Sequence, residues 1–422
     1  MNTSQQVFAV VETQFSNFGL TPFKAATLLG YRTVLISKDP ERFRALTSAG
    51  EVFSSYVDEV VVADTNSTAE LLTVLRPVRD GGNLAGVYTL TDYSLVQVAE
   101  AAEHLSLPGL TVEAARRCVN KLEMRKACHL HGVRVPEFEQ STSLEQAIAV
   151  ANGFGYPCVL KPMTESASIG VTLCRNEEDV RTAFESLTAS PFNFRGQLRP
   201  EGVLVEEYIV GFEVSVESFH DGVQRHTIGV TDKNLGPHPF FVEMGETFPS
   251  MLSDQYVDVC IEASSRALDA VGHRFGGAHV EIKLTREGPS VVEVNGRIAG
   301  AEITQLVKLA TGLDLQAELI KLHSGQKPKL VRTQSRSATS RYLVSRESGT
   351  LSEVTGMDLA WRIPGVVEVS IEVEPGKRVS QAESNLDVLG YVLAEADTAG
   401  DSVRAAETAA GQISFLVKRG AQ

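Results

Sequence analysis

The sequence has few cysteines, and no two of them are closely spaced. Five cysteines are spread over 422 residues, an odd number without any CxxC spacing. A disulfide framework needs paired cysteines and a zinc site needs clustered ones, so the sequence indicates neither. Most of the cysteines have apolar neighbours. We therefore expect buried, reduced thiols, which are typical of a cytoplasmic protein.

The chain also lacks a basic tract and a long apolar run. Its formal net charge is −14, without any block of five or six like charges. Nucleic acids and anionic membranes attract cationic surfaces, so neither is expected as the main partner. No apolar run approaches the ~20 residues of a membrane span, and the N-terminal MNTSQQ lacks the regions of a secretory signal. A small anion such as a nucleotide is compatible with this charge, because local donors act at short range.

The first hundred residues alternate short apolar runs with amphipathic stretches, which is the pattern of a layered α/β domain. Four runs predict buried strands, at 8–12, 33–37, 59–64 and 85–90. PFKAATLLG predicts a helix that ends at Gly30. ETQFSNFG follows the first strand and contains no GxGxxG, so a dinucleotide site is not expected there.

The middle of the chain predicts capped helices and a series of strands. Thr111 and Asn120 are each suited to cap the helix that follows. Strands are predicted at 156–162, 171–174, 203–209, 213–219 and 223–230, and helices near 143–152, 177–189, 254–272 and 302–311. The stretch 231–250 is interpreted as a long binding loop. The polar stretch 324–340 is interpreted as a linker to a smaller α+β module.

A predicted hairpin between AHVEIKL and SVVEV carries polar side chains on one face. A turn centred near Glu287 sets Glu281 opposite Glu293. The same register sets His279 opposite Asn295, and because strand side chains alternate, all four share a face. The other face is expected to be apolar and to consist of Val280, Ile282, Leu284, Val292 and Val294.

This pairing suggests a metal site. Two carboxylates that face each other, with Cβ atoms about 4.5–5.5 Å apart, should repel. A divalent cation bound by Glu281, Glu293 and Asn295 would remove that repulsion. Hard oxygen ligands suit Mg²⁺, which commonly links protein carboxylates to substrate phosphates. The alternative interpretation is a polar strand that faces solvent.

Taken in order, these motifs resemble those of ATP-grasp carboxylate–amine ligases. VLKP with MTESASIGV is similar to the lysine strand and phosphate loop of that family, and VLVEEYIVGFEVSVE to its adenine and ribose strand. HVEIKL with VEVNGR is similar to its metal hairpin, and NKLEMRKACHLHGVRVPEF to the helix with a second phosphate-binding lysine. The resemblance covers most of 1–325. It is greatest to the L-amino-acid ligases that make dipeptides, on KPMTESASIGVTL, AHVEIKL and the extra C-terminal module.

The resemblance implies an ATP-grasp fold, with α/β and α+β parts. A Rossmann-like α/β domain is expected over 1–110, the ATP-grasp region over 111–325 and a small C-terminal α+β module over 326–422. Within the ATP-grasp region, the lid is expected at about 133–205 and the metal-binding, catalytic part at about 206–325.

The resemblance also implies which residues bind ATP. Lys161 ends a strand beside a loop rich in small residues, where its ammonium can meet the α- and β-phosphates; the alternative is a surface lysine. Lys121, at the start of a helix, is the second implied phosphate ligand. The alternative is an exposed helix lysine. The other implied contacts are Ser166, Ser168 and Gly170 in the phosphate loop, and Glu206, Glu207, Tyr208, Ile209 and Glu213 in the adenine and ribose segment.

The residues after the hairpin are expected to hold the substrates. The Arg297 guanidinium suits the carboxylate that is activated and the acyl phosphate, both of which accept bidentate hydrogen bonds. His279 is a catalytic candidate as a phosphate contact or general base, with a satisfied core histidine as the alternative. Gly300 and Ala301 leave room beside the activated group. Glu243 is a candidate to meet the ammonium of the amine substrate, with a carboxylate of a solvated loop as the alternative.

The implied reaction is ATP-dependent amide formation. A carboxylate attacks the γ-phosphate of ATP and an amine then attacks the acyl phosphate, with ADP and phosphate as products. The implied cofactors are ATP and Mg²⁺, or Mn²⁺ in its place, and the implied substrates are small acids and amines, above all amino acids. Two alternatives stay open: a formate- or bicarbonate-activating enzyme of purine or biotin-type metabolism, and a nucleotide-binding module without catalysis. A homodimer is a further state that the sequence leaves open.

Overall fold

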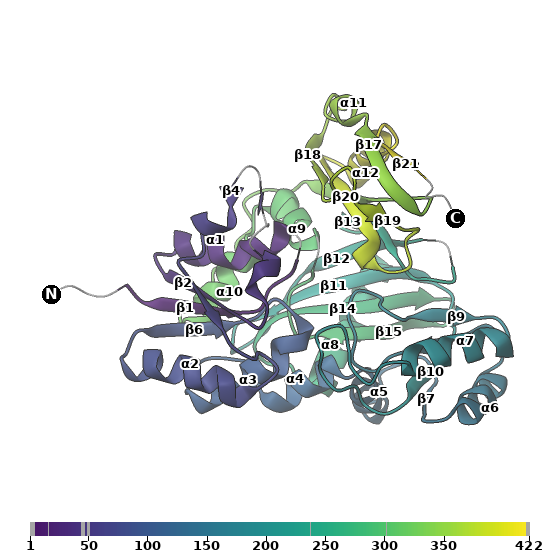
Figure 1. Ribbon diagram of the computed structural model, residues 1–422, viewed down its shortest axis with the longest axis horizontal. Helices are drawn as coiled ribbons and strands as arrows, with labels where there is room; N and C mark the ends of the chain where they lie inside the picture. The colour runs from purple at the N-terminus through teal and green to yellow at the C-terminus, as the bar shows by residue number, and fades with distance from the viewer. Residues whose placement is uncertain are drawn as a thin grey trace.

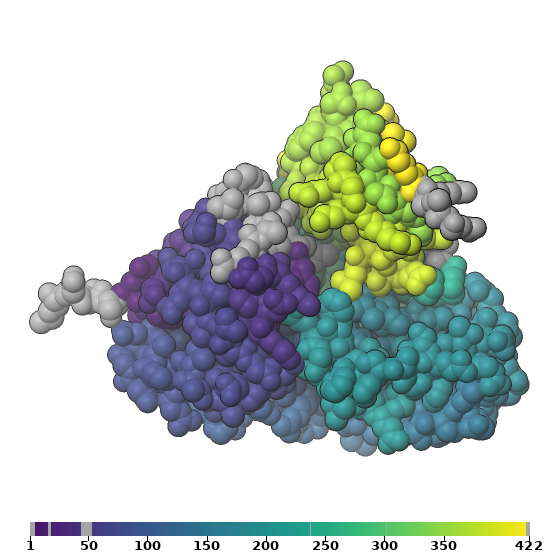
Figure 2. Space-filling view, in the orientation of Figure 1, coloured from purple at the N-terminus to yellow at the C-terminus, as the bar shows by residue number. Residues whose placement is uncertain are grey.

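The computed structural model describes residues 5–15, 17–43, 47–48, 51–236, 238–300 and 302–418. In Figure 1 the N-terminal part (purple) lies beside a long central sheet (teal and green), and the C-terminal part (green to yellow) stands above that sheet. The space-filling view in Figure 2 shows the C-terminal part rising above the purple and blue N-terminal part and the teal middle of the chain. Within these ranges, every helix is too short or too polar to cross a lipid bilayer.

The N-terminal part is a parallel sheet flanked by helices, as the sequence pattern predicted. Its strands follow the order β5–β2–β1–β6 and are β1 (Val7–Val11), β2 (Arg32–Ser37), β5 (Glu59–Val62) and β6 (Leu84–Tyr88). Its helices are α1 (Thr21–Leu28), α2 (Thr68–Asp80) and α3 (Leu95–His104). Two short strands pair with each other, β3 (Thr47–Ser48) and β4 (Glu51–Val52). Thr13 and Asp92 follow β1 and β6, at the carboxyl edge where parallel sheets bind ligands.

Two helices link the N-terminal part to the lid, α4 (Val112–Val119) and α5 (Lys121–Leu130). Both begin where predicted, because the Thr111 and Asn120 side chains accept hydrogen bonds from backbone N–H groups of the turns that follow. Lys121 is therefore the first residue of α5. Its backbone N–H donates to the Met163 carbonyl at 2.9 Å, which ties the helix to the phosphate loop.

The lid is an antiparallel sheet with two helices. Its strands follow the order β7–β10–β8–β9 and are β7 (Phe138–Ser141), β8 (Cys158–Lys161), β9 (Thr172–Cys174) and β10 (Val203–Glu207). Its helices are α6 (Leu144–Phe154) and α7 (Glu177–Thr188). The predicted phosphate loop, 163–170, joins the paired strands β8 and β9, so both of its ends are fixed.

The central sheet follows the order β15–β14–β11–β12–β13–β16–β20–β18. Its strands are β11 (Phe212–His220), β12 (Arg225–Leu235), β13 (Glu243–Phe248), β14 (Gly276–Thr285), β15 (Gly288–Asn295), β16 (Ser337–Val344), β18 (Val366–Ile371) and β20 (Val388–Ala396). The helices that pack on it are α8 (Asp254–Val271), α9 (Ile303–Thr311) and α12 (Ala399–Ala410). Helix α10 (Leu315–His323) instead returns to cover β6 and α1 of the N-terminal part.

A small outer sheet completes the C-terminal part. It follows the order β19–β17–β21 and consists of β17 (Gly349–Thr355), β19 (Arg378–Val379) and β21 (Ser414–Lys418), with the short helix α11 (Met357–Ala360) nearby. All five cysteines are buried and unpaired, as expected.

Three predictions about the central sheet were wrong. The stretch 231–250 is not a long irregular loop, because β12 continues to Leu235 and β13 begins at Glu243. The linker is shorter than predicted, because 337–340 belongs to β16, which pairs with β13. Val292 is not on the apolar face of the hairpin, because the register shifts beside Glu281 and pairs Ile282 with Val291. The end of β12 and strand β13 were predicted as a loop because their sequences are polar, although these polar residues face a cavity and not solvent.

Candidate active site

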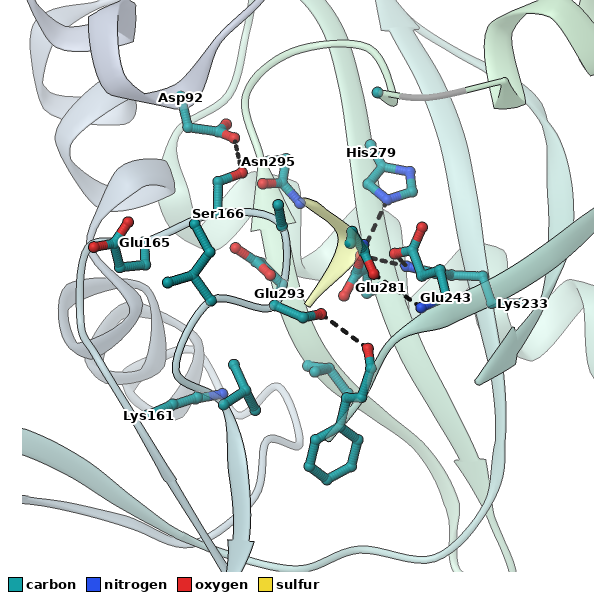
Figure 3. Close-up of a pocket in the computed structure, with 18 of the residues that line it drawn as sticks. Asp92, Lys161, Glu165, Ser166, Lys233, Glu243, His279, Glu281, Glu293 and Asn295 are labelled. Atoms are coloured by element: carbon teal, nitrogen blue, oxygen red, sulfur yellow. Dashed lines mark hydrogen bonds and ion pairs between the residues drawn. The ribbon is translucent and has the colours of Figure 1, made fainter. Parts of the chain in front are cut away.

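A cavity of about 540 Å³ lies where the N-terminal part, the lid, the central sheet and the C-terminal part meet. Of the site residues predicted from the sequence that the structure describes, all but Gly170 line this cavity. Ala301 lies outside the described residues. At Gly170, φ is +73° and an added Cβ would lie 2.6 Å from Leu187, so the glycine is needed for close packing behind the wall. Figure 3 shows side chains from the lid, the hairpin and the N-terminal part around the cavity.

Lys161 is held at the end of β8 by a buried ion pair. Its Nζ lies 2.7 Å from Glu206 Oε2, and the other Glu206 oxygen lies 2.7 Å from Arg125 Nε. Arg125 is 0% exposed and Lys161 4% exposed, which excludes the surface-lysine alternative. Burial lowers the pKa of Lys161 to about 8, and the Glu206 charge offsets part of that effect. The Glu206 carboxylate therefore positions the lysine, a role that the sequence analysis did not assign to it.

Lys121 connects the phosphate loop to the hairpin. Its Nζ donates to the Glu165 carbonyl at 2.7 Å and to Glu293 Oε1 at 2.9 Å. The side chain is buried, so the alternative of an exposed helix lysine is excluded. Burial lowers its pKa, but the charge and hydrogen bond of Glu293, together with the charges of Asp92 and Glu281, outweigh burial and raise the pKa overall. Lys121 is thus a cation within the cavity wall.

The hairpin has the predicted register at its functional end. Glu281 faces Glu293, and His279 faces Asn295. His279 donates from both ring nitrogens, with Nδ1 3.0 Å from Glu217 Oε2 and Nε2 3.3 Å from Glu281 Oε1. Burial lowers the pKa of His279, but the two carboxylates outweigh it and raise the pKa to about 10. In this arrangement the ring is a donor to both carboxylates.

Lys233, on β12, is the second buried cation beside the hairpin. Its Nζ lies 2.5 Å from Glu281 Oε1 and 2.7 Å from Glu243 Oε1. These carboxylates raise its pKa well above the usual value despite the opposing effect of burial. Figure 3 shows Lys233 between the two carboxylates. The predicted repulsion between Glu281 and Glu293 is therefore relieved within the protein, because each carboxylate has its own lysine.

The hairpin residues fit a Mg²⁺ ion that also binds phosphate oxygens. Among the described residues, no three His, Cys, Asp or Glu side chains converge closely enough to hold a metal by themselves. Mg²⁺ usually keeps water and substrate phosphates among its ligands, so two carboxylates and one amide suffice. The Asn295 amide is 4% exposed and makes no side-chain hydrogen bond to any described residue. Its oxygen is thus available beside Glu281 and Glu293.

Arg297 faces an aspartate from the N-terminal part. Its Nη2 contacts Asp92 Oδ2, and Ser166 Oγ of the phosphate loop donates to the same oxygen at 2.9 Å. The Arg297 Nε is buried and has no partner among the described residues. Nη1 donates to the Ile298 carbonyl at 3.0 Å. The guanidinium lines the cavity with Asp92 already bound to it, so an anion that enters would compete with a carboxylate.

The phosphate loop adopts a strained, closed conformation. Ala167 and Ser168 both have φ of +58°, a left-handed conformation that non-glycine residues seldom adopt. Ser168 Oγ donates to the Phe241 carbonyl at 3.0 Å. Glu165 accepts from Tyr93 at 2.8 Å and pairs with Arg199, so the loop is fastened both to the N-terminal part and within the lid. The two predicted serine hydroxyls already have protein partners.

The predicted adenine and ribose segment forms another wall of the cavity. Tyr208 hydrogen-bonds His238 at 2.9 Å, and Ile209 lines the cavity beside it. Glu207 turns its carboxylate to the Glu137 N–H at 3.1 Å. The carboxylate of Glu213 is buried and lies 3.6 Å from Lys283, and burial is the main cause of its raised pKa.

The predicted substrate-binding residues differ in whether they already have partners within the protein. Gly300 lines the cavity, and an added Cβ there would lie 2.7 Å from Gln14, so the backbone approaches the N-terminal part closely. Glu243 is neutralised by Lys233, and its N–H donates to Asn385 at 2.9 Å. Glu243 is therefore already paired with a cation inside the protein.

Sequence reasoning missed the residues that hold the predicted ones in place, namely Asp92, Arg125, Glu165, Glu217 and Lys233. The sequence could have indicated Lys233, because it lies two residues after Thr231 on a strand and therefore shares its face. In the structure Lys233 is paired with Glu213 of the neighbouring strand. Each of the others makes a contact more than 60 positions away, with Arg297, Glu206, Tyr93 or His279, which no local pattern predicts.

Comparisons with known proteins identify the domains of this chain and its relatives. Residues 154–305 match the ATP-grasp domain, 23–109 the ATP-grasp N-terminal domain and 341–418 the L-amino acid ligase C-terminal domain 2. An uncharacterized protein of Sinorhizobium fredii is 35% identical over 338 residues, which cover 80% of this chain and 69% of that protein. Alanine–anticapsin ligase of Bacillus subtilis is 26% identical over 72% of this chain and 66% of its own length.

Solved structures with a similar fold include ligases of the same kind. The crystal structure of L-amino acid ligase from Bacillus licheniformis superposes with a TM-score of 0.81 over 99% of this chain and 100% of that one, at 20% identity. Phosphoribosylglycinamide synthetase from Anaerococcus prevotii superposes with a TM-score of 0.71 over 98% of this chain and 100% of that one, at 17% identity. The chain spans about two thirds of the length of the first two sequence relatives. It belongs to the ATP-grasp ligase superfamily and carries the C-terminal domain of the L-amino acid ligases.

Proposed function

We propose that this protein is an ATP-dependent ligase that joins two amino acids, or similarly small acids and amines, into a dipeptide-like amide. The observation that carries the proposal is that the C-terminal domain helps to build the ATP-grasp cavity. Tyr342 and Tyr391 line it, and Asn385 contacts both Glu243 and the phosphate loop at Ala167. A domain type that is named for L-amino acid ligases thus supplies part of the wall.

The proposed chemistry has two steps. A carboxylate oxygen of the acid attacks the γ-phosphorus, the bond to the β-phosphate oxygen breaks, and ADP leaves with that electron pair. The amine, once deprotonated, then attacks the acyl carbon, and phosphate departs as the amide forms. Lys121 and Lys161 are buried cations that would offset charge on the phosphates. Mg²⁺, held by Glu281, Glu293 and Asn295, would neutralise phosphate oxygens as charge moves onto them.

The closed lid favours transfer of the acyl group to an amine over its loss to water. Arg195 of the lid lies 2.6 Å from Glu12, and Gln197 donates to the Tyr93 carbonyl at 2.6 Å. These contacts cover the cavity from the N-terminal side, so an acyl phosphate would be shielded from solvent. Arg297 would hold the acid by exchanging its Asp92 contact for the substrate carboxylate.

The alternatives are less well supported. A formate- or bicarbonate-activating enzyme would share the fold, but the similarity in fold is greater to the L-amino acid ligase, at a TM-score of 0.81, than to a biotin carboxylase domain in complex with bicarbonate, at 0.71. A nucleotide-binding module without catalysis would not need Glu281, Glu293, Asn295 and Arg297 together around one cavity.

The experiment is a matrix of amino acids as acid and amine, with phosphate release and product mass as readouts. We expect ADP, phosphate and a dipeptide, and a hydroxamate of the acid when hydroxylamine replaces the amine. Release of AMP and pyrophosphate would refute the acyl-phosphate route. Activity only with formate, bicarbonate or a phosphoribosyl amine would refute the amino-acid assignment.

A further inference from the structure

One side of the cavity is acidic, and in the described part of the chain no cation pairs with its carboxylates. Glu302, just before helix α9, and Glu372, just after β18, line the cavity, and Glu246 of β13 and Glu368 of β18 lie in the elements behind them. Among the described residues, no Lys, Arg or His lies within ion-pair distance of any of these four carboxylates. The wall thus differs from the hairpin, where Glu281 and Glu293 each have a lysine.

Two of these carboxylates are buried and incompletely satisfied. Glu302 is 5% exposed and lines the cavity, and among the described residues the Tyr342 hydroxyl lies near enough to hydrogen-bond its carboxylate. Glu246 is 0% exposed, and its Oε1 has no partner in the described part of the chain. The Tyr342 hydroxyl, which lies between them, donates its one proton to Glu246 Oε2 at 2.7 Å. Buried carboxylate oxygens without donors are costly unless a ligand supplies the donors.

Glu368 adds negative charge beside this wall, and its own carboxylate already has hydrogen-bond partners. Glu368 accepts from Tyr391 at 2.7 Å and from Gln305 at 2.8 Å, which are neutral donors. Tyr391 lines the cavity, as do Ile303, Leu386 and Val388. The wall therefore combines an anionic end with apolar and aromatic sides.

We propose that this wall, the acidic subsite formed by Glu246, Glu302, Tyr342 and Tyr391, binds the terminal ammonium or guanidinium of a basic amino-acid substrate. The proposal rests on the proposed function and names the side chain of one of its substrates. Donors at the end of an aliphatic chain would satisfy Glu302 directly and draw on the charge of Glu246 behind it. The apolar side chains and the tyrosine rings would cover the methylene groups.

A metal ion is a poorer occupant than an organic cation. No group of three acidic, His or Cys side chains among the described residues has the geometry to hold a metal. The flanking apolar residues would also contribute no ligands to a hydrated ion. An alkyl chain, by contrast, buries against them favourably.

Binding of a cation should change the protonation of the Glu302 and Glu246 carboxyl groups, and this change can be measured. Burial, followed by the Glu246 charge, raises the pKa of Glu302 well above its usual value. Burial and the Glu243 charge raise the pKa of Glu246 to about 8. The groups that face them from neighbouring elements are Tyr342, Tyr391, Glu243, Glu368, Glu372 and, more distantly, Lys233. A cation that enters should ionise these carboxyls, so its binding should release protons near neutral pH.

The test compares ligands that differ only in the terminal charge. Lysine is paired with norleucine and arginine with citrulline, and binding to the full chain is measured by calorimetry in two buffers of different ionisation enthalpy. We expect the charged member of each pair to bind on the order of tenfold tighter and to release protons. Equal affinity within both pairs, or no proton release, would overturn the proposal.

Variants locate the effect. Glu302→Gln should reduce the lysine-to-norleucine preference about tenfold, and Glu246→Gln should weaken it less. The control, Glu374→Gln, removes an exposed charge from the same part of the chain and should leave the preference unchanged. An unchanged preference in a folded Glu302→Gln protein would overturn the proposal, and if that variant does not fold, the wild-type comparison decides.

The activity matrix separates this proposal from the ligase function. If basic and neutral amino acids are joined equally well, the ligase proposal stands and the acidic subsite is refuted. If no amino acid pair releases phosphate but lysine and arginine still bind with the expected preference, the subsite stands and the ligase proposal is refuted.

Discussion

Replacing Arg125 by methionine should destabilise the protein by about 3 kcal/mol or more, which is the lower end of the range for breaking a buried ion pair. Arg125 is 0% exposed and holds both oxygens of Glu206, at 2.7 and 3.1 Å. It also donates to the Val291 carbonyl at 3.1 Å. Methionine has a similar length but no donors, so three hydrogen bonds from a charged donor are lost, two to the Glu206 carboxylate and one to a carbonyl. Charge-assisted bonds contribute about 1.5–3 kcal/mol each.

The loss of unfolding free energy should stay near the lower end of the range for breaking a buried ion pair, because Glu206 is not left unpaired. Lys161 remains 2.7 Å from Glu206, so one cation still neutralises the carboxylate. Removing the Arg125 charge should also raise the pKa of Lys161, since that charge is one of the effects that lower it. Glu206→Met should therefore be worse than Arg125→Met, because it leaves two buried cations without their anion.

The assay is urea unfolding followed by circular dichroism, with Lys126→Met as the control. Lys126 is the next residue of α5, and its ion pair with Glu123 is exposed, with side-chain exposures of 57% and 50%. That control should change the free energy of unfolding by about 0–1 kcal/mol. If Arg125→Met costs no more than Lys126→Met, the reasoning about the buried ion pair is wrong.

Three further predictions concern the cavity. Glu293→Gln should reduce turnover on the order of 100-fold at limiting Mg²⁺, whereas Glu287→Gln in the exposed hairpin turn should not; equal activities would contradict the metal assignment. Because the pKa of Lys161 is lowered to about 8, ATP affinity should fall as the pH rises through that value, and a flat pH titration would argue against a phosphate contact. Below that pKa the buried ammonium opposes folding, so stability measured by urea unfolding should increase as the pH rises from about 8 towards the ordinary lysine pKa. Arg297→Lys should raise KM for the acid about tenfold but leave KM for ATP unchanged, because a lysine cannot bind a carboxylate in bidentate fashion; a change confined to ATP would place Arg297 at the nucleotide.

Local patterns in the sequence predicted the hairpin and the helix starts. The alternation around Glu287 set the pairing of Glu281 with Glu293, and the pairing is present in the structure. Asn120 was recognisable because a side-chain cap acts within one turn of its own helix. In both cases, the interacting residues are close in sequence or related by a simple register.

Other features depend on contacts that no local pattern reveals. Asp92 meets Arg297, 205 positions away, only because β6 and the hairpin end at the same cavity. Strand β13 was overlooked because Glu243 and Glu246 make its sequence polar, although Glu246 is fully buried. Burial of polar residues around a cavity inverts the usual pattern of apolar positions inside and polar positions outside.

The junction between β13 and β16 limits how the chain can be shortened. Thr247 pairs with Thr339 and Phe248 with Ala338, so the C-terminal strands continue the hydrogen-bonded ladder of the central sheet. A truncation in the polar stretch before Ser337 would remove β16 and leave β13 with unpaired backbone groups and an uncovered Phe248, which is 1% exposed in the intact chain. Exposed strand edges of this kind recruit strands from other molecules and promote aggregation. The C-terminal part is consequently a poor candidate for removal or for exchange between relatives at that stretch.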